Sequence, residues 1–381
     1  MIDLQLNERT FSISYENETI QLLRKEFLLF SYLYKNKGQS FTRNELLDAV
    51  WKLETPSDRT VDDHIYRLRK KLGDWEHLFF IETVKGYGYR LLIHDETDKN
   101  SHPMLSDKEF GEQTRKLFHL YYLYGQGTAL HTLTTTKSLG FPITNEQKIY
   151  LTLLKGDFKT IVETDTFPQS QKMFMILYLY SYVETDLHKV IVKLEAALDK
   201  RLLPEHLKSE IEWFNLPFVY LQTNQVKRAI ALVNTAKNHV STPEHGYYPL
   251  LTLLETMIFL QIRNLDAVKE NMKLMENFFK QRPYQRELGL FTILEGLYDI
   301  VTTSKHIPGQ KLINKGLDII ANSRHTYYFL FAYKVINHFL EIYDSNSTLR
   351  NDYKKMENKF FQDHQLFHLT PEITKQVNSF V

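Results

Sequence analysis

The chain has 381 residues, and its 47 Lys and Arg residues nearly balance 46 Asp and Glu residues, for a formal net charge of +1. The 43% hydrophobic and 24% charged content is typical of a folded protein and excludes a wholly disordered one. No cysteine is present, which excludes a disulfide framework, a thiolate zinc site and a cysteine nucleophile.

The first residues lack the basic and apolar regions of a secretory signal peptide. The longest nearly uncharged apolar stretch, 173–183, is far shorter than the roughly 20 residues that a membrane-spanning helix needs. We therefore expect a cytoplasmic protein with no membrane partner.

The chain opens with short β-prone runs at 4–6, 10–15 and 19–22. Polar clusters at 7–9 and 16–18 separate these runs. Alternating runs divided by polar turns are typical of strands, so this segment predicts a small antiparallel sheet.

Three helical patterns follow the predicted sheet. Apolar residues at 27–34 predict a first helix that ends at Gly38, because glycine is favoured just after a helix. Thr42 and Glu45 have the spacing of a capping box, which predicts the start of a second helix. A third helix is predicted over 59–72.

Two β-prone runs, 79–84 and 89–93, flank a glycine-containing turn and predict a β-hairpin. The polar segment 96–108 contains Pro103 and is the best candidate for a linker. At about 100–200 residues per domain, the chain has room for two or three domains. We therefore place the first domain at 1–95.

The third predicted helix has a basic surface. Val61, Ile65 and Leu68 recur at helical spacing and predict a buried face. Five basic residues outnumber two acidic ones between positions 59 and 71, although residues 1–95 as a whole have a net charge of −1. A basic helix of this kind fits the major groove of DNA, and the alternative is an ordinary solvated charged face. Asp62 and Asp63 point about 100° apart on a helix, so Asp62 is better suited to positioning an arginine than to sharing a substrate.

Residues 1–95 resemble the winged-helix effector domain of OmpR/PhoB-type bacterial regulators. The resemblance runs through four blocks in the family's order, at 22–29, 41–51, 59–72 and 81–90. It implies an α+β winged helix-turn-helix whose third helix reads double-stranded DNA.

The resemblance also implies which residues contact DNA. The recognition helix would meet bases and phosphates through Arg59, Thr60, His64, Arg67, Arg69, Lys70 and Lys71. Lys85, at the hairpin tip, would enter the minor groove or touch its phosphates. Tyr66 stands where the family often has another arginine. The segment between Trp51 and Arg59 resembles a loop that some members use to contact RNA polymerase, which makes polymerase a candidate partner.

From about residue 109 onward, long apolar-periodic segments alternate with short polar breaks. The breaks begin at Gly156, Thr185, Asn224, Asn264, Lys305 and Ser345. From Thr185 onward, successive breaks are about 40 residues apart. This spacing predicts helix pairs stacked into an all-α tetratricopeptide-like solenoid over 109–381. The strict tetratricopeptide consensus is absent.

The layout resembles that of antibiotic-regulatory activators and of peptide-pheromone receptors. We expect control of the first domain to come from 109–381 rather than from a phosphorylated receiver. Aromatic walls with a few amides suit an extended peptide, and the candidate ligand residues are Trp213, Asn215, Tyr248, Tyr328 and Asn337. The alternative for each of these aromatic residues is packing in the core between helices.

His364 and His368 have helical metal-ligand spacing, but the sequence places no third ligand beside them, so we expect neither a metal nor a cofactor. No hydrolase, zinc-protease or P-loop motif is present, and we expect no enzyme. The sequence predicts a sequence-specific, homodimeric transcriptional regulator whose helical domain senses a signal, most simply a short peptide, and thereby controls dimer geometry. The alternative is an adaptor whose solenoid binds a protein and no small ligand.

Overall fold

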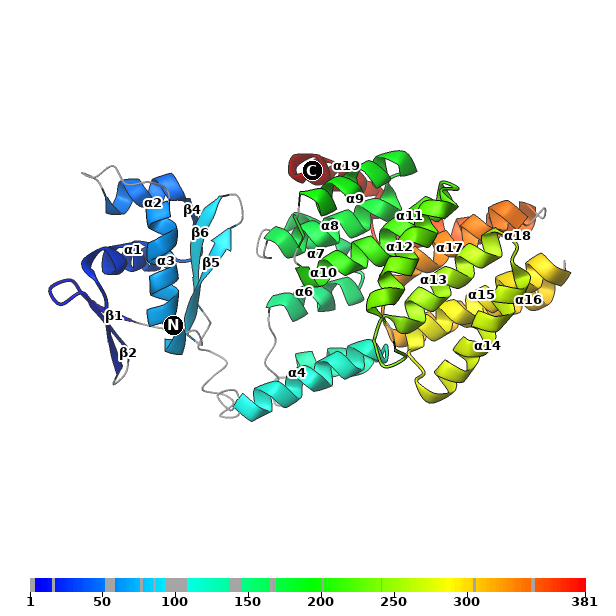
Figure 1. Ribbon diagram of the computed structural model, residues 1–381, viewed down its shortest axis with the longest axis horizontal. Helices are drawn as coiled ribbons and strands as arrows, with labels where there is room; N and C mark the ends of the chain where they lie inside the picture. The colour runs from blue at the N-terminus through cyan, green and yellow to red at the C-terminus, as the bar shows by residue number, and fades with distance from the viewer. Residues whose placement is uncertain are drawn as a thin grey trace. The chain divides into compact units, whose positions relative to one another are not determined.

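A computed structural model describes residues 4–15, 18–51, 59–75, 78–84, 87–93, 108–136, 145–164, 167, 169–200, 202–203, 205–240, 242–303, 306–343 and 347–381. The chain divides into two compact units, residues 1–108 and 109–381 (Figure 1). The predicted linker at 96–108 lies almost entirely outside the described residues.

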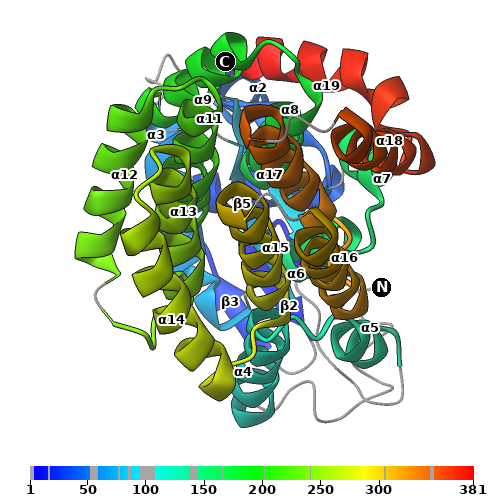
Figure 2. The same cartoon turned by 90° about the vertical axis from the view of Figure 1, so that its right-hand side faces the viewer.

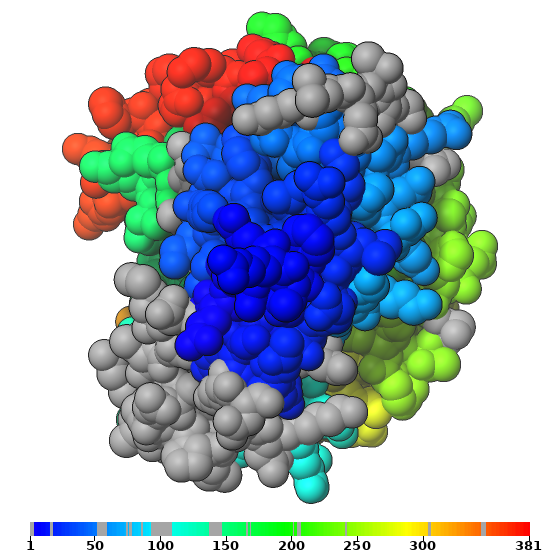
Figure 3. All heavy atoms as spheres, turned by 90° about the vertical axis from the view of Figure 1, so that its left-hand side faces the viewer, coloured from blue at the N-terminus to red at the C-terminus, as the bar shows by residue number. Residues whose placement is uncertain are grey.

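The N-terminal unit begins with a three-stranded antiparallel sheet of β1 (Gln5–Asn7), β2 (Ser12–Tyr15) and β3 (Glu18–Gln21). Ile13 of β2 pairs with Leu6 and Ile20 and is fully buried. The predicted alternation of polar and apolar residues therefore places one face of this short sheet against the core. These residues are the dark-blue spheres in Figure 3.

Three helices and a second sheet complete the unit. The helices are α1 (Arg24–Lys35), α2 (Arg43–Val50) and α3 (Arg59–Lys71), followed by a 3-10 turn at Gly73–Trp75. The second sheet has the strand order β4 (Ser40–Thr42), β6 (Gly88–Ile93), β5 (Phe79–Val84). The hairpin of β5 and β6 was predicted from the sequence, whereas the three-residue strand β4 was not.

The start of α2 and the β4–β6 pairing lie side by side. The Glu45 N–H donates to Thr42 Oγ1 at 3.2 Å, and the Thr42 N–H donates to Glu45 Oε2 at 2.7 Å, as the capping box predicts. Gly88 pairs with Thr42, and a Cβ at position 88 would lie 2.0 Å from the Phe41 carbonyl oxygen. Only glycine lets the two strands approach this closely.

The C-terminal unit is helical throughout its described part. It begins with α4 (Lys108–Leu123), α5 (Gly127–Thr135), α6 (Asn145–Leu154), α7 (Phe158–Glu163), α8 (Gln169–Val183), α9 (Leu187–Asp199) and α10 (Glu205–Glu210). A π-helical turn at Ile211–Asn215 leads into α11 (Leu216–Gln222), α12 (Val226–His239), α13 (Tyr248–Gln261) and α14 (Leu265–Gln281). The last five helices are α15 (Gln285–Thr303), α16 (His306–Ser323), α17 (Tyr328–Tyr343), α18 (Ser347–Asp363) and α19 (Leu366–Phe380). No helix in the described part of the chain is both long and apolar enough to span a membrane.

The predicted breaks at Gly156, Thr185, Asn224 and Asn264 all lie between successive helices. Those at Lys305 and Ser345 fall outside the described residues, in the short gaps that separate α15 from α16 and α17 from α18. The expected succession of helix pairs is therefore present. Its similarity to tetratricopeptide solenoids stays a prediction.

Helices α15 and α16 touch backbone to backbone, and they run side by side in Figure 2. A Cβ at Gly296 would lie 2.5 Å from the Gly309 carbonyl oxygen, and one at Gly289 would lie 2.8 Å from that of Gly316. The glycines recur seven residues apart on each helix, so both contacts fall on one seam.

The helical unit also closes on itself. The carbonyl oxygen of Gly156, between α6 and α7, lies 2.9 Å from Nδ1 of His364 at the end of α18. Gln376 of α19 donates to the carbonyl oxygen of Val162 at 2.9 Å. The last helices thus pack against α6 to α8, far earlier in the chain (Figure 2). The sequence had predicted only a concave solenoid surface, and this closure was not foreseen.

Candidate functional site

Helix α3 presents one buried face and one exposed face. Val61, Ile65 and Leu68 are buried, as their spacing predicted. The side chains of Arg59, Tyr66, Arg67 and Lys70 are exposed, and Tyr66 is 68% exposed despite its aromatic ring. These four positions share one helical surface with the exposed Asp63, and the four are called the exposed face of α3.

Two other predicted DNA contacts are engaged inside the domain. Arg69 donates from Nε to the Ile81 carbonyl oxygen at 3.0 Å and from Nη2 to Thr83 Oγ1 at 2.8 Å, which ties α3 to β5. Lys71 Nζ lies 2.7 Å from Glu26 Oε2, and the Glu26 side chain is completely buried. Both cations therefore hold α3 in place.

The start of α3 is fixed by Asp62. Its Oδ1 accepts hydrogen bonds from Arg43 Nε at 2.8 Å and from the Tyr89 hydroxyl at 2.6 Å. Burial opposes ionisation of Asp62, but the hydrogen bonds from Tyr89 and Arg43 outweigh it and lower the pKa of this carboxyl. Asp62 thus joins α3 to α2 and β6, and it positions an arginine as the sequence suggested.

Two further predicted residues lie near the start of α3. His64 Nδ1 lies 2.8 Å from the Thr60 carbonyl oxygen, and the His64 ring packs edge-on against Trp51 at 5.1 Å. Both His64 and Thr60 are partly buried. Lys85 and the segment between Trp51 and Arg59 lie outside the described residues.

The exposed face of α3 is available to a partner. Within the described part of the chain, the side chains of Arg59, Tyr66, Arg67 and Lys70 make no hydrogen bond or ion pair. Three cations and an aromatic ring on one helix face can bind phosphates and base edges. Tyr66 was noted in the sequence only as a departure from a family pattern.

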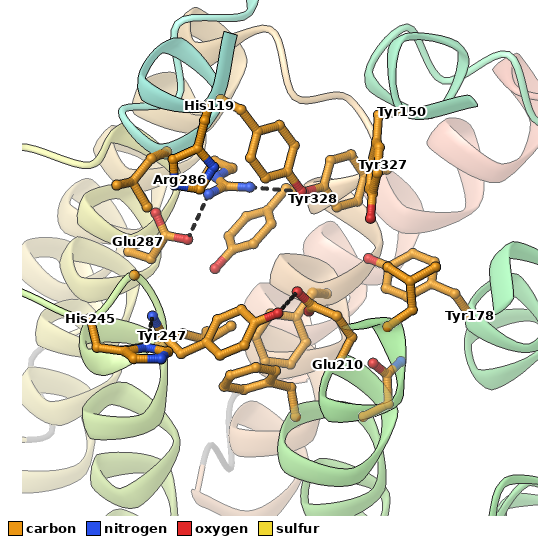
Figure 4. Close-up of a pocket in the computed structure, with 18 of the residues that line it drawn as sticks. His119, Tyr150, Tyr178, Glu210, His245, Tyr247, Arg286, Glu287, Tyr327 and Tyr328 are labelled. Carbon is orange, nitrogen blue, oxygen red and sulfur yellow. Dashed lines mark hydrogen bonds and ion pairs between the residues drawn. The ribbon is translucent and has the colours of Figure 1, made fainter. Parts of the chain in front are cut away.

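The C-terminal unit contains a cavity of about 680 Å³ that is partly open to solvent. Its walls come from α4, α6, α8, α10, the π-helical turn, the segment before α13, α15 and α17 (Figure 4). Because these elements span positions 115 to 331, the cavity depends on contacts between helices far apart in the sequence. The volume is that of a small-molecule site, for which about 300–1,000 Å³ is usual.

Tyrosines dominate the cavity wall, contributed by Tyr122, Tyr150, Tyr178, Tyr182, Tyr247, Tyr327 and Tyr328. Several of their rings pack edge to face, including Tyr122 with Tyr150 at 5.6 Å and Tyr178 with Tyr327 at 5.9 Å. The wall is therefore apolar in its ring faces and polar at its hydroxyls.

A buried ion pair lies at the start of α15. Arg286 Nη2 is 3.3 Å from Glu287 Oε1, and Arg286 Nη1 donates to the Tyr327 hydroxyl at 3.0 Å. The guanidinium also lies 4.7 Å from the centroid of the Tyr122 ring. Burial of Glu287 raises the pKa of its carboxyl, although the charge of Arg286 opposes this shift.

A second carboxylate, that of Glu210, faces the ion pair across the cavity in Figure 4. The Tyr247 hydroxyl donates to Glu210 Oε1 at 2.7 Å. Burial raises the pKa of Glu210, although the hydrogen bond from Tyr247 and the charge of Arg286 oppose this shift. Among the described residues, no basic side chain forms a salt bridge with Glu210.

Only two of the five predicted ligand residues line the cavity. These two are Asn215 and Tyr328. Trp213 instead stacks on His239, Tyr248 packs against Phe278, and Asn337 donates to Glu357 Oε2 at 3.0 Å. The last three form contacts between helices, which is the alternative that the sequence left open for the two aromatic residues.

Sequence reasoning missed the charged residues of the cavity. The available signal was the adjacent pair Arg286 and Glu287, which begins a helix with no further charged residue before Glu295. His364, considered above as a metal ligand, packs on Phe360 at 4.4 Å. Over the described residues, no group of three or more His, Asp or Glu side chains is arranged to hold a metal.

Residues 17–91 match the family described as "Transcriptional regulatory protein, C terminal". Over 90 residues, 23% of this chain, the sequence is 42% identical to the transcriptional regulatory protein VxrB of Vibrio cholerae. Over 93 residues, 24% of this chain, it is 38% identical to the heme response regulator HssR of Staphylococcus aureus. The N-terminal unit therefore contains a winged-helix DNA-binding domain of the OmpR/PhoB type.

These similarities lie in the N-terminal unit. They cover 35% of VxrB and 42% of HssR, so the chain spans less than half the length of these relatives. The solved DNA-binding domain of Bacillus subtilis CssR is 33% identical, with 24% of this chain and all of that one covered and a TM-score of 0.21.

Proposed function

We propose that this chain is a sequence-specific DNA-binding transcriptional regulator, and that its helical unit controls DNA binding by responding to a ligand in the tyrosine-lined cavity. The observation that carries the DNA-binding part is the exposed face of α3, where Arg59, Tyr66, Arg67 and Lys70 make no polar contact within the described residues. The proposed role is one of binding rather than catalysis.

The four residues have different roles in this proposal. Arg67 reads a base edge in the major groove, because arginine pairs in bidentate fashion with guanine. Arg59 and Lys70 bind phosphates and set the position of the helix. Tyr66 packs its exposed ring against the groove. Arg69, Lys71 and Asp62 act indirectly by holding α3 against β5, α1 and α2.

The ligand-dependent part of the proposal involves two copies of the chain. A homodimer places two α3 helices on repeated half-sites, whose spacing is set by the geometry of the dimer. A ligand shifts DNA binding only if it prefers one dimer geometry over another. A short peptide is the proposed ligand class, since an aromatic cavity with scattered polar groups suits a peptide. RNA polymerase is a further proposed partner.

Selection of genomic DNA tests the proposal. Purified full-length protein is mixed with sheared DNA from the source organism at about 150 mM salt, which weakens purely electrostatic binding. We expect a few enriched fragments that share a repeated motif. Uniform retention of all fragments, with and without added cell extract, would contradict sequence-specific binding. Retention of a protein from the extract without enriched DNA would favour the adaptor role.

A further inference from the structure

The cavity contains a carboxylate, that of Glu210, with which no basic side chain forms a salt bridge among the described residues, although Arg115 and Arg286 also line the cavity. Arg286 pairs with Glu287, and its guanidinium is also bonded to Tyr327 and stacked on Tyr122. The carboxylate of Glu210 receives only the hydrogen bond from Tyr247 among the described residues. Glu210 is partly buried, and removing a carboxylate from water without a cation is unfavourable, so a positive charge that entered the cavity would be stabilised there.

Unsatisfied polar atoms are also present in the cavity wall. Glu287 Oε2 and the Tyr328 hydroxyl have no hydrogen-bond partner, although both residues are only 5% exposed. An unpaired buried polar atom costs about 1–3 kcal/mol. Like the carboxylate of Glu210, these atoms can accept hydrogen bonds, and an ammonium group is a hydrogen-bond donor with no acceptor of its own.

We propose that the cavity binds a primary ammonium group attached to an aromatic or apolar body, with Glu210 and Glu287 as its carboxylate partners. The tyrosine rings provide faces that attract a cation and cover the apolar part of the ligand. The amino end of a short peptide has this chemistry, as does a small aromatic amine. This inference refines the ligand class of the proposed function and rests on it.

The charges also give the ligand a direction. Arg115, His119 and His245 line the cavity but are exposed, whereas Glu287 is buried. A peptide bound with its ammonium group inward would direct its carboxylate toward this basic rim. The reverse orientation would place a carboxylate against Glu210, and Arg286 is already neutralised by Glu287.

Binding of matched probes to the full-length protein tests the inference. The probes are phenethylamine, N-acetylphenethylamine, 3-phenylpropionate, the tripeptide Phe-Leu-Phe and its N-acetyl form, each at up to about 1 mM and followed by calorimetry and thermal shift. We expect the free amines to bind and their acetylated forms to bind at least about tenfold more weakly. Preference for Phe-Leu-Phe over phenethylamine would identify the peptide as the source of the ammonium group, and the opposite preference would identify a small amine.

Two variants test whether Glu210 is a carboxylate that binds the free amines. Glu210→Gln keeps the size of the side chain and removes its charge, and we expect it to weaken binding of the free amines about tenfold. Glu212→Gln is the matched control, because Glu212 lies two residues away and does not line the cavity. If Glu210→Gln does not fold, the comparison between free and acetylated probes on the unchanged protein still decides the question.

Three results would overturn the inference. These are equal binding of free and acetylated amines, preference for 3-phenylpropionate, and failure of every probe to bind. Selection of specific DNA fragments by the same preparation separates a failure of the inference about the cavity from a failure of the proposed function. If specific DNA is selected while the probes fail, only the inference about the cavity is lost; if neither occurs, the proposed function is lost as well.

Discussion

Lys71, on the basic helix α3, forms an ion pair with Glu26 of α1: its Nζ lies 2.7 Å from Glu26 Oε2. The Glu26 carboxylate is completely buried and also accepts the Leu23 N–H at 2.9 Å. A lysine that the sequence assigns to DNA is therefore also the counter-ion of a buried acid. The end of α3 is fixed to the start of α1 by this contact.

Lys71→Ala should therefore destabilise the N-terminal unit. We expect a loss of about 1–3 kcal/mol in the free energy of unfolding, less than for a fully buried pair because Lys71 is partly exposed. Chemical denaturation followed by tryptophan fluorescence measures the change, since Trp51 and Trp75 are both buried in this unit. An unchanged midpoint would show that Glu26 does not need Lys71.

Lys70→Ala should act on DNA binding instead. Lys70 is exposed and makes no ion pair among the described residues. We expect weaker binding to all DNA sequences alike and a slope of log K against log salt that is smaller by about one. Fluorescence anisotropy over a salt series gives both quantities. Lys35→Ala, on the exposed part of α1, serves as the control and should leave the slope unchanged.

Gly296→Ala should push α15 and α16 apart, because the new Cβ would lie 2.5 Å from the Gly309 carbonyl oxygen. Overpacking of this kind costs about 1–3 kcal/mol, which exceeds the gain in helix propensity. Gly111→Ala is the control, since nothing lies within 4 Å of its Cβ position in helix α4. Thermal unfolding should show a lower Tm for the first variant and an equal or higher Tm for the second.

Two histidines of the helical unit should lower its stability as the pH falls below 6.5. Burial and the charge of Arg286 lower the pKa of His325 to about 3, and burial lowers the pKa of His338 to about 4. Below pH 6.5 the unfolded chain therefore takes up protons that the folded chain excludes. Each histidine contributes up to about 1.4 kcal/mol per pH unit until its folded pKa is reached.

His338→Gln should reduce this pH dependence. Denaturation of the wild-type protein and the variant at pH 7 and pH 5.5 gives the comparison. His338 Nε2 lies 2.7 Å from the side-chain oxygen of Gln261, and an amide at position 338 retains a donor. Parallel losses of stability in the two proteins would show that His338 is protonated in the folded state.

Local patterns predicted much of the N-terminal unit. Thr42 and Glu45 form the capping box that their spacing indicates, and Val61, Ile65 and Leu68 are the buried face of α3. Helical spacing and caps depend on neighbours within a few residues, so the sequence shows them directly. The partnership of Lys71 with Glu26, 45 residues away, depends on the tertiary fold and has no local signal.

The cavity was harder to predict for the same reason. Aromatic residues in the first helix of each pair suggested a binding surface, but Trp213 and Tyr248 pack between helices while Asn215 and Tyr328 reach the cavity. The cavity exists because α15 and α17 lie against α4, α6 and α8, as in the hydrogen bond between the hydroxyls of Tyr122 and Tyr327, 205 residues apart. Helical periodicity alone does not encode such contacts.

The role of the exposed face of α3 in reading DNA is tested most directly by measuring how tightly two proteins bind each of two DNA fragments. The dissociation constants of the wild-type protein and of Arg67→Ala are measured for a selected genomic fragment and for a scrambled fragment of equal length, at about 150 mM salt. We expect the wild-type protein to prefer the selected fragment by about 1,000-fold or more, and Arg67→Ala to lose about 1–3 kcal/mol on that fragment alone. Equal losses on both fragments, or no preference by the wild-type protein, would contradict the assignment of α3 as the helix that reads DNA.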